Sequence, residues 1–152
     1  MNDRRGANEI LPLKEWGKEY GRQLEDLSKL DAENLVEISR KIGQFLIQGS
    51  YLSGKGKKRM NLKVNQLRRF LTAARRVESD LKRKKFKEIK DNIIFLRPKL
   101  AYAAGREEQA IPLHNVLDPA IQSGAESREN FLKLLRLIEG IIAYHRFYGG
   151  TN

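Results

Sequence analysis

The chain has 152 residues, of which 40% are hydrophobic and 32% charged, and its 30 Lys and Arg against 19 Asp and Glu give a formal net charge of +11. This balance supports a packed domain with a charged surface, and the absence of cysteine excludes a disulfide framework, thiolate chemistry and cysteine-ligated zinc. Apolar runs are too short for a membrane-spanning helix or a secretory signal, so we expect a cytoplasmic protein without membrane contact.

The N-terminal part combines a polar start with a weak helical pattern. The first ten residues are polar, and Gly17 and Gly21 weaken the amphipathic helix that follows. Its apolar residues recur at spacings of three and four: Leu13, Trp16, Tyr20, Leu24 and Leu27. We therefore separate residues 1–30, a polar segment with an amphipathic helix, from a main helical domain at residues 31–152.

Helical periodicity continues from residue 31 to residue 81. Asp31 is placed to cap a second helix that runs to Gly49 or shortly after it. Residues 53–59 carry glycine and lysine without strand alternation or an Asn-Gly turn, and therefore predict a loop. A third helix opens at Asn61 or Asn65. The inward stripes of the two helices are Leu35, Ile38, Ile42 and Phe45, and then Val64, Leu67, Leu71, Ala74, Val77 and Leu81.

Three further helical segments follow. The first segment breaks near Arg97, because proline lacks the backbone donor that a helix interior needs. A new helix starts with Pro98 as its first residue, and Gly105 should end this helix. A proline-interrupted segment ends at Gly124, and Ser127 caps the last helix, which has a wide apolar face. Together the segments predict an all-α fold, a compact bundle of about five to six helices.

The positive charge is concentrated in the middle of the chain. Between Lys55 and Arg106 there are 18 basic and four acidic residues, a local net charge of +14, whereas the remainder carries −3. In the third helix the cations form two rows with a spacing of seven residues, about 10 Å along a helix. Since the apolar stripe faces inward, both rows face outward and favour a polyanion as partner. The rows are Arg68, Arg75 and Lys82, and Arg69, Arg76 and Arg83.

A second group of cations lies in the predicted loop, where glycine hinges give them freedom to follow a phosphate backbone. For aromatic stacking on bases, Tyr51, Tyr102 and Tyr148 are candidates for exposure, whereas Phe70 fits the core. Backbone contact is therefore expected to outweigh base recognition. The loop cations are Lys55, Lys57, Lys58 and Arg59.

No combination of residues in the sequence fits a catalytic site. Residues 49–55 match the spacing of a phosphate-binding loop, but Gly56 stands where the magnesium-binding Ser or Thr belongs, and a helix precedes the motif. His114 and His145 are the only histidines, which leaves little for histidine chemistry, so we expect structural roles for both. We therefore predict no enzyme activity, no metal and no cofactor.

Two stretches of sequence give more specific information about the kind of protein than the composition does. They are LRPKLAYAAGR at residues 96–106 and IIAYHRFYGG at residues 141–150, and a basic QLRRF segment at residues 66–70 starts 30 residues before the first. In this order and separation they resemble the small subunit of type III-A CRISPR interference complexes, the Csm family. The similarity covers residues 35–150.

The resemblance implies a non-catalytic subunit that stacks in several copies beside a larger repeated subunit of a crRNA-guided complex. There it would bind the backbones of guide RNA and target RNA in antiviral defence, without sequence specificity, while other subunits cleave RNA. By position, Arg68, Arg69, Lys99 and Arg106 would face RNA, whereas Tyr102, Tyr144 and Phe147 would pack. With the charge analysis, the predicted RNA-binding residues are Lys55, Lys57, Lys58, Arg59, Arg68, Arg69, Arg75, Arg76, Lys99 and Arg106.

Charge alone also allows other functions. A free-standing basic nucleic-acid-binding protein would not copurify with a guide RNA complex, and a protein-interaction scaffold would meet acidic proteins with its basic face. An unrecognised nuclease would degrade RNA in the presence of divalent metals. Assembly with partner subunits and self-association are expected from the wide apolar face of the last helix and from the stacking that the resemblance implies.

Overall fold

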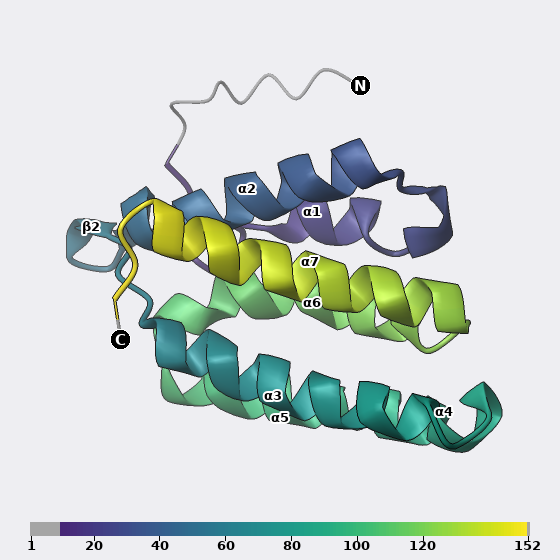
Figure 1. Cartoon of the computed structure of the whole chain (residues 1–152). Helices are drawn as coiled ribbons and strands as arrows, with labels where there is room; N and C mark the ends of the chain where they lie inside the picture. The colour runs from purple at the N-terminus through teal and green to yellow at the C-terminus, as the bar shows by residue number, and fades with distance from the viewer. Residues whose placement is uncertain (1–9, 152) are drawn as a thin grey trace.

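The computed structural model describes residues 10–151 (Figure 1). Within this range six helices have nine or more residues, and the only strands form one small hairpin, so the predicted all-α bundle of about five to six helices is confirmed. In chain order the elements are α1 (Lys18–Gln23), the 3-10 helix η1 (Leu27–Lys29), α2 (Ala32–Gln48), β1 (Ser50–Ser53), β2 (Gly56–Arg59), α3 (Val64–Leu81), α4 (Phe86–Ile94), α5 (Leu96–Arg106), the 3-10 helix η2 (Glu108–Ala110), α6 (Ile111–Gly124) and α7 (Arg128–Phe147).

Helix α7 lies at the centre of the bundle. It packs against α2, α3 and α6, and Figure 1 shows α1 and α2 on one side of the α6 and α7 pair, with α3 and α5 on the other. Helix α4 lies at one end of the bundle and the hairpin at the other. The buried apolar side chains form one continuous core, in which Phe131 of α7 is fully buried.

Two of the predicted helix caps are confirmed. The Asp31 carboxylate accepts a hydrogen bond from the backbone N–H of Asn34 at 2.8 Å, and the Ser127 hydroxyl oxygen accepts one from the backbone N–H of Asn130 at 3.0 Å. Each cap satisfies a backbone donor that the first turn of a helix leaves without a partner. These caps begin α2 and α7, two of the helices that contribute to the core of the bundle.

Helices α2 and α7 run parallel and approach each other closely. A Cβ atom on Gly43 would lie 2.8 Å from the backbone nitrogen of His145 and 2.8 Å from the carbonyl oxygen of Ile141. A Cβ atom on Gly140 would lie 2.6 Å from the Ser39 hydroxyl oxygen. Because only glycine has no Cβ, these positions allow the two backbones to come together.

The predicted helix over residues 13–27 is much shorter in the structure. Gly17 has φ of +90°, a left-handed conformation that interrupts the helical path, and α1 covers only Lys18–Gln23. After it, the Asp26 side chain caps η1. Leu24 and Leu27 are nevertheless buried in the same core as the later helices. The division of the chain at residue 30 stays a prediction.

The predicted loop at residues 53–59 is wrong, because these residues belong to an antiparallel hairpin in which Tyr51 pairs with Lys58. Gly54 and Lys55 form the turn, and Gly56 directly after them has φ of +105°, a left-handed conformation that glycine adopts easily. Tyr51 is 2% exposed, not exposed as expected, and its hydroxyl donates to a Glu108 carboxylate oxygen at 3.1 Å. The backbone N–H of Leu52 also donates to the Leu11 carbonyl at 3.0 Å, which ties the hairpin to the N-terminal segment.

The break before α5 falls close to the predicted position. Helix α4 ends at Ile94 and α5 begins at Leu96, so Pro98 is the third residue of the helix and not the first. Proline fits there because the N–H groups of the first turn have no partner within the helix. Gly105 does not end α5, which continues to Arg106. Within residues 10–151, no helix combines the length and apolar character needed to cross a bilayer.

Candidate nucleic-acid interface

Helix α3 separates its apolar and cationic residues onto different faces. Its apolar residues are buried at spacings of three and four, so the arginines between them point outward. Arg68, Arg69, Arg75 and Arg76 are all exposed, as the periodicity predicted. The buried stripe is Val64, Leu67, Phe70, Ala74, Val77 and Leu81.

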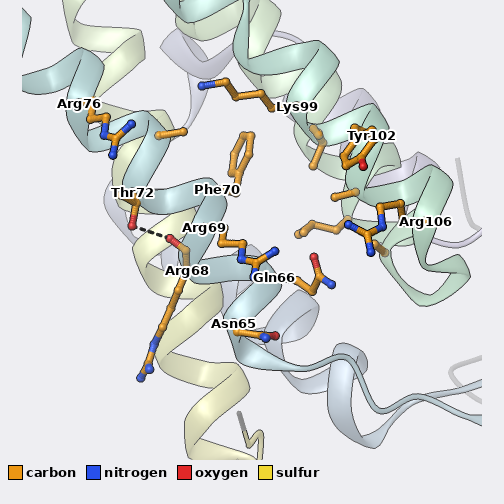
Figure 2. Close-up of a pocket in the computed structure, with 15 residues that line it drawn as sticks. Asn65, Gln66, Arg68, Arg69, Phe70, Thr72, Arg76, Lys99, Tyr102 and Arg106 are labelled. Atoms are coloured by element: carbon orange, nitrogen blue, oxygen red, sulfur yellow. Dashed lines mark hydrogen bonds between the residues drawn. The ribbon is translucent and has the colours of Figure 1, made fainter.

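A groove of about 550 Å³ lies between α3 and α5 (Figure 2). Its floor is apolar and includes Phe70 and Leu100, and its rim is formed by longer polar and charged side chains. We call it the α3–α5 groove. It is lined by Asn65, Gln66, Arg68, Arg69, Phe70, Thr72, Ala73, Arg76, Lys99, Leu100, Tyr102, Ala103, Arg106, Ala110 and Leu113.

The rim of the groove is cationic from both helices. Arg69 and Arg76 come from α3, and Lys99 and Arg106 come from α5; in Figure 2, Arg69 and Lys99 lie on opposite sides of the Phe70 ring. In the described part of the chain, Arg69, Arg76 and Lys99 form no ion pair, and no Asp or Glu lines the groove. The structure thus brings four of the predicted residues together around one groove, where no carboxylate balances their positive charge.

The row that contains Arg68 and Arg75 lies on a neighbouring face of α3. Arg75 does not line the groove, and its guanidinium lies 3.9 Å from a carboxylate oxygen of Glu139 on α7. Arg68 lines the groove, but in Figure 2 its side chain extends away from the Phe70 ring. The four arginines that the sequence grouped together are therefore divided between two surfaces.

The hairpin cations lie outside the groove but next to one end of it. Gln109 of η2 accepts a hydrogen bond from the backbone N–H of Asn61 at 2.8 Å and donates one to the Arg59 carbonyl at 3.3 Å. This fixes the base of the hairpin to the segment that directly follows Arg106. All four hairpin cations are exposed: Lys55, Lys57, Lys58 and Arg59.

Arg97 and Lys99 occupy the same motif but have different surroundings. The Arg97 guanidinium donates to both carboxylate oxygens of Asp118 on α6, at 2.8 and 3.0 Å. These hydrogen bonds lower the pKa of the Asp118 carboxyl below its usual value. Arg97 therefore joins α5 to α6, whereas Lys99 lines the groove.

Several aromatic residues differ from the sequence-based expectation. Tyr102 and Phe147, which the resemblance placed in packed positions, are 67% and 76% exposed, so that part of the prediction is wrong. The Arg106 guanidinium lies 5.7 Å from the centre of the Tyr102 ring, a cation–π contact. Tyr148, a candidate for exposure, is half-buried, and its hydroxyl oxygen accepts a hydrogen bond from Arg40 at 3.3 Å.

The histidines lie away from the groove. His145 is fully buried, its Nε2 lies 2.6 Å from the Leu62 carbonyl oxygen, and burial lowers the pKa of its imidazole. His114 is half-buried in α6. Among residues 10–151, no group of three His, Cys, Asp or Glu side chains is placed to hold a metal ion.

Sequence reasoning found Arg69 and Arg76 but missed Asn65, Gln66 and Thr72, the polar residues that complete the groove. Asn65, Arg69, Thr72 and Arg76 follow one another at spacings of four, three and four, which is one face of α3. The same rule that found the apolar stripe could have found this face. That it meets α5 depends on tertiary packing, which local spacing does not determine.

These features define a class: a small, basic helical bundle with a cationic groove. The family model described as Csm2 Type III-A matches residues 29–151. The chain therefore belongs to the Csm2 type III-A family, and the family predicted from the sequence motifs is confirmed. Among its relatives, the CRISPR system Cms protein Csm2 of Streptococcus thermophilus is 30% identical over 95 residues, which cover 60% of this chain and 76% of that protein.

Proposed function

We propose that this chain is the non-catalytic small subunit of a type III-A CRISPR effector complex and binds guide and target RNA through their phosphates. Family membership supports the place in the complex. The observation that carries RNA binding is the α3–α5 groove, where Arg69, Arg76, Lys99 and Arg106 converge without a carboxylate. The hairpin cations at residues 55–59 extend this surface beyond the end of the groove.

The chemistry of the groove suits phosphate groups. Arginine presents several N–H donors in one plane and binds phosphate oxygens in pairs, while lysine contributes a compact charge. Each contact releases a condensed counterion from the nucleic acid, so affinity falls steeply with salt. Because phosphates carry no sequence information, such contacts hold RNA of any sequence.

A binding role without catalysis fits the residues of the groove. Of the side chains that line it, none is a carboxylate or histidine that could act as a general base, and all the charged ones are cations. We infer that cleavage of RNA is the task of other subunits.

Assembly with partner subunits and with further copies of this chain is part of the same proposal. Exposed aromatic side chains are enriched at protein interfaces, and Phe95 and Phe147 are both largely exposed. Copurification of a guide RNA and other subunits with the tagged chain would support assembly. Recovery of the chain alone, with RNA bound, would favour a free-standing RNA-binding protein.

The RNA contact is tested by a salt titration of the full-length chain with two unrelated unstructured RNAs. The variant Arg69→Glu with Arg76→Glu should weaken binding of both RNAs equally and reduce the log–log salt slope by about 1.4, since each single-strand contact contributes about 0.7. The matched control is Arg22→Glu with Arg128→Glu, which changes two exposed arginines outside the groove and gives the same net charge.

The control should keep the wild-type slope. Binding that does not respond to salt, or an equal loss of slope in both double variants, would show that the groove is not the RNA contact. Circular dichroism of both variants checks that the helical fold persists.

A further inference from the structure

The floor of the α3–α5 groove has properties that phosphate binding does not require. Phe70, Leu100 and Leu113 are buried and apolar, and each lines the groove. Phosphates need donors and charge, and they gain nothing from an apolar floor. The volume of about 550 Å³ lies within the range of about 300 to 1,000 Å³ that is typical of small-ligand pockets.

Small side chains keep the groove open. Ala73 of α3 and Ala103 of α5 are half-buried and form its walls, where larger side chains would fill the space. Above them, the long cations of the rim carry like charge, which opposes closure of the two helices. The groove is therefore an open slot with an apolar floor and a cationic edge.

Polar groups suited to base edges stand at one end of this slot. Asn65 and Gln66 line the groove with side-chain amides, which offer both donors and acceptors. Within residues 10–151, neither amide has a hydrogen-bond partner. On the α5 side, the exposed Tyr102 ring with the Arg106 guanidinium over it provides a flat surface for stacking.

We propose that the α3–α5 groove binds an unstacked nucleobase of single-stranded RNA. The base lies over the apolar floor against Phe70 and Tyr102, and its neighbouring phosphates contact Arg69, Arg76 and Lys99. The inference rests on the proposed RNA binding and adds a preference for unpaired bases. A base within a duplex is stacked between its neighbours and cannot enter the slot without being flipped out.

Charge selects a nucleic acid over a protein segment as the occupant. An amphipathic helix would have to lay its apolar face on the floor and present an acidic polar face to the cationic rim. Here the charged side chains that line the groove are all cations and none is a carboxylate, which matches a base flanked by phosphates. Because every base presents an aromatic face, stacking tolerates any sequence and agrees with binding that does not depend on sequence.

Abasic RNA provides the test. A fluorescein-labelled unstructured RNA is compared, by anisotropy, with the same RNA carrying abasic residues and with its duplex. Wild-type full-length chain should bind the intact strand about tenfold more tightly than the abasic strand, as the stacking of one base predicts. The duplex should behave like the abasic strand at matched phosphate number.

A variant that fills the groove sharpens the comparison. Ala73→Leu with Ala103→Leu should lower the affinity for the intact strand to that for the abasic strand and leave the salt slope unchanged. Ala101→Leu is the matched control, because Ala101 is exposed on the same helix and does not line the groove. Thermal melting checks that the filled variant folds.

The outcomes separate this inference from RNA binding itself. Equal wild-type affinity for intact and abasic strands, or equal loss of both in the filled variant, overturns the base site while salt-sensitive RNA binding stands. Stronger competition by an acidic peptide than by intact RNA, lost in the filled variant, would identify a peptide groove and also overturns it. Absence of binding to every RNA overturns both proposals.

Discussion

The two sides of the bundle bring helices together in opposite ways. Between α2 and α7, Gly43 and Gly140 allow a close approach, because a Cβ atom at either position would lie under 3 Å from atoms of the other helix. Between α3 and α5, Ala73 and Ala103 face a groove of about 550 Å³. Both contacts use small side chains, but only one of them is closed.

Charge and side-chain length account for the difference. The α2–α7 contact lies within the core, whereas the α3–α5 groove is edged by cations from both helices. Burying unpaired cations carries a large desolvation penalty, so their helices stay far enough apart to keep them in water. Small residues at a helix contact therefore produce a tight seam where the surroundings are apolar and a binding slot where they are charged.

The largest effect is expected at the closed contact. Gly43→Ala places a Cβ atom 2.8 Å from backbone atoms of α7, which cannot move aside as a side chain could. We expect a loss of about 1 to 3 kcal/mol in the free energy of unfolding, as for other overpacked cores. Urea unfolding measures it.

The matched control for Gly43 is Gly105→Ala. Gly105 also lies in a helix, but no atom lies within 4 Å of the position its Cβ would take. There alanine should stabilise the helix by up to about 1 kcal/mol. Equal effects at the two positions would contradict a backbone contact at Gly43.

An intermediate effect on stability is expected at Arg97 but not at Lys99. Arg97→Gln removes two hydrogen bonds to Asp118, so we expect a loss of about 1 to 2 kcal/mol of stability with an unchanged salt slope for RNA. Lys99→Gln removes the same charge but should leave stability within about 0.5 kcal/mol and reduce the salt slope by about 0.7. Urea unfolding and RNA titration are run on both variants.

The result that would contradict this division is a similar loss of slope in both variants. In that case net charge, and not the position of the cation at the groove, would govern RNA binding.

The smallest effect is expected in the pH dependence of stability, through the buried His145 of α7. Burial lowers the pKa of the His145 imidazole below 6.5, so the unfolded chain takes up a proton at higher pH than the folded chain. Stability should therefore rise with pH between that lowered pKa and about 6.5, and fall as pH decreases through this window. The slope cannot exceed about 1.4 kcal/mol per pH unit for one group.

Urea unfolding across this window, for wild type and His145→Gln, measures the effect. The variant should lose this part of the pH dependence. Asp118 acts in a different range, because its pKa lies below 3.8 and the stability it contributes is lost only as pH falls through that lower value. An unchanged profile in His145→Gln would show that other groups are responsible.

Local interactions explain what the sequence could predict. Helical periodicity and the caps at Asp31 and Ser127 depend on residues within four positions of each other, so spacing and residue type reveal them. The outward direction of the arginines on α3 follows from the same rule, because the apolar stripe must face the core. The family was also predictable, since the motifs at residues 96–106 and 141–150 are continuous in sequence.

Tertiary packing decided the rest. Arg69 and Arg76 meet Lys99 and Arg106 because α3 and α5 pack side by side, while Arg75 turns toward Glu139 on α7. The hairpin likewise depends on contacts with Leu11 and Gln109, which lie far from it in the chain. The sequence alone determined which residues are cationic and which helix faces they occupy. Only the packing of helices far apart in sequence decided which of those cations share a groove, because their relative position is set by the common core and not by spacing along the chain.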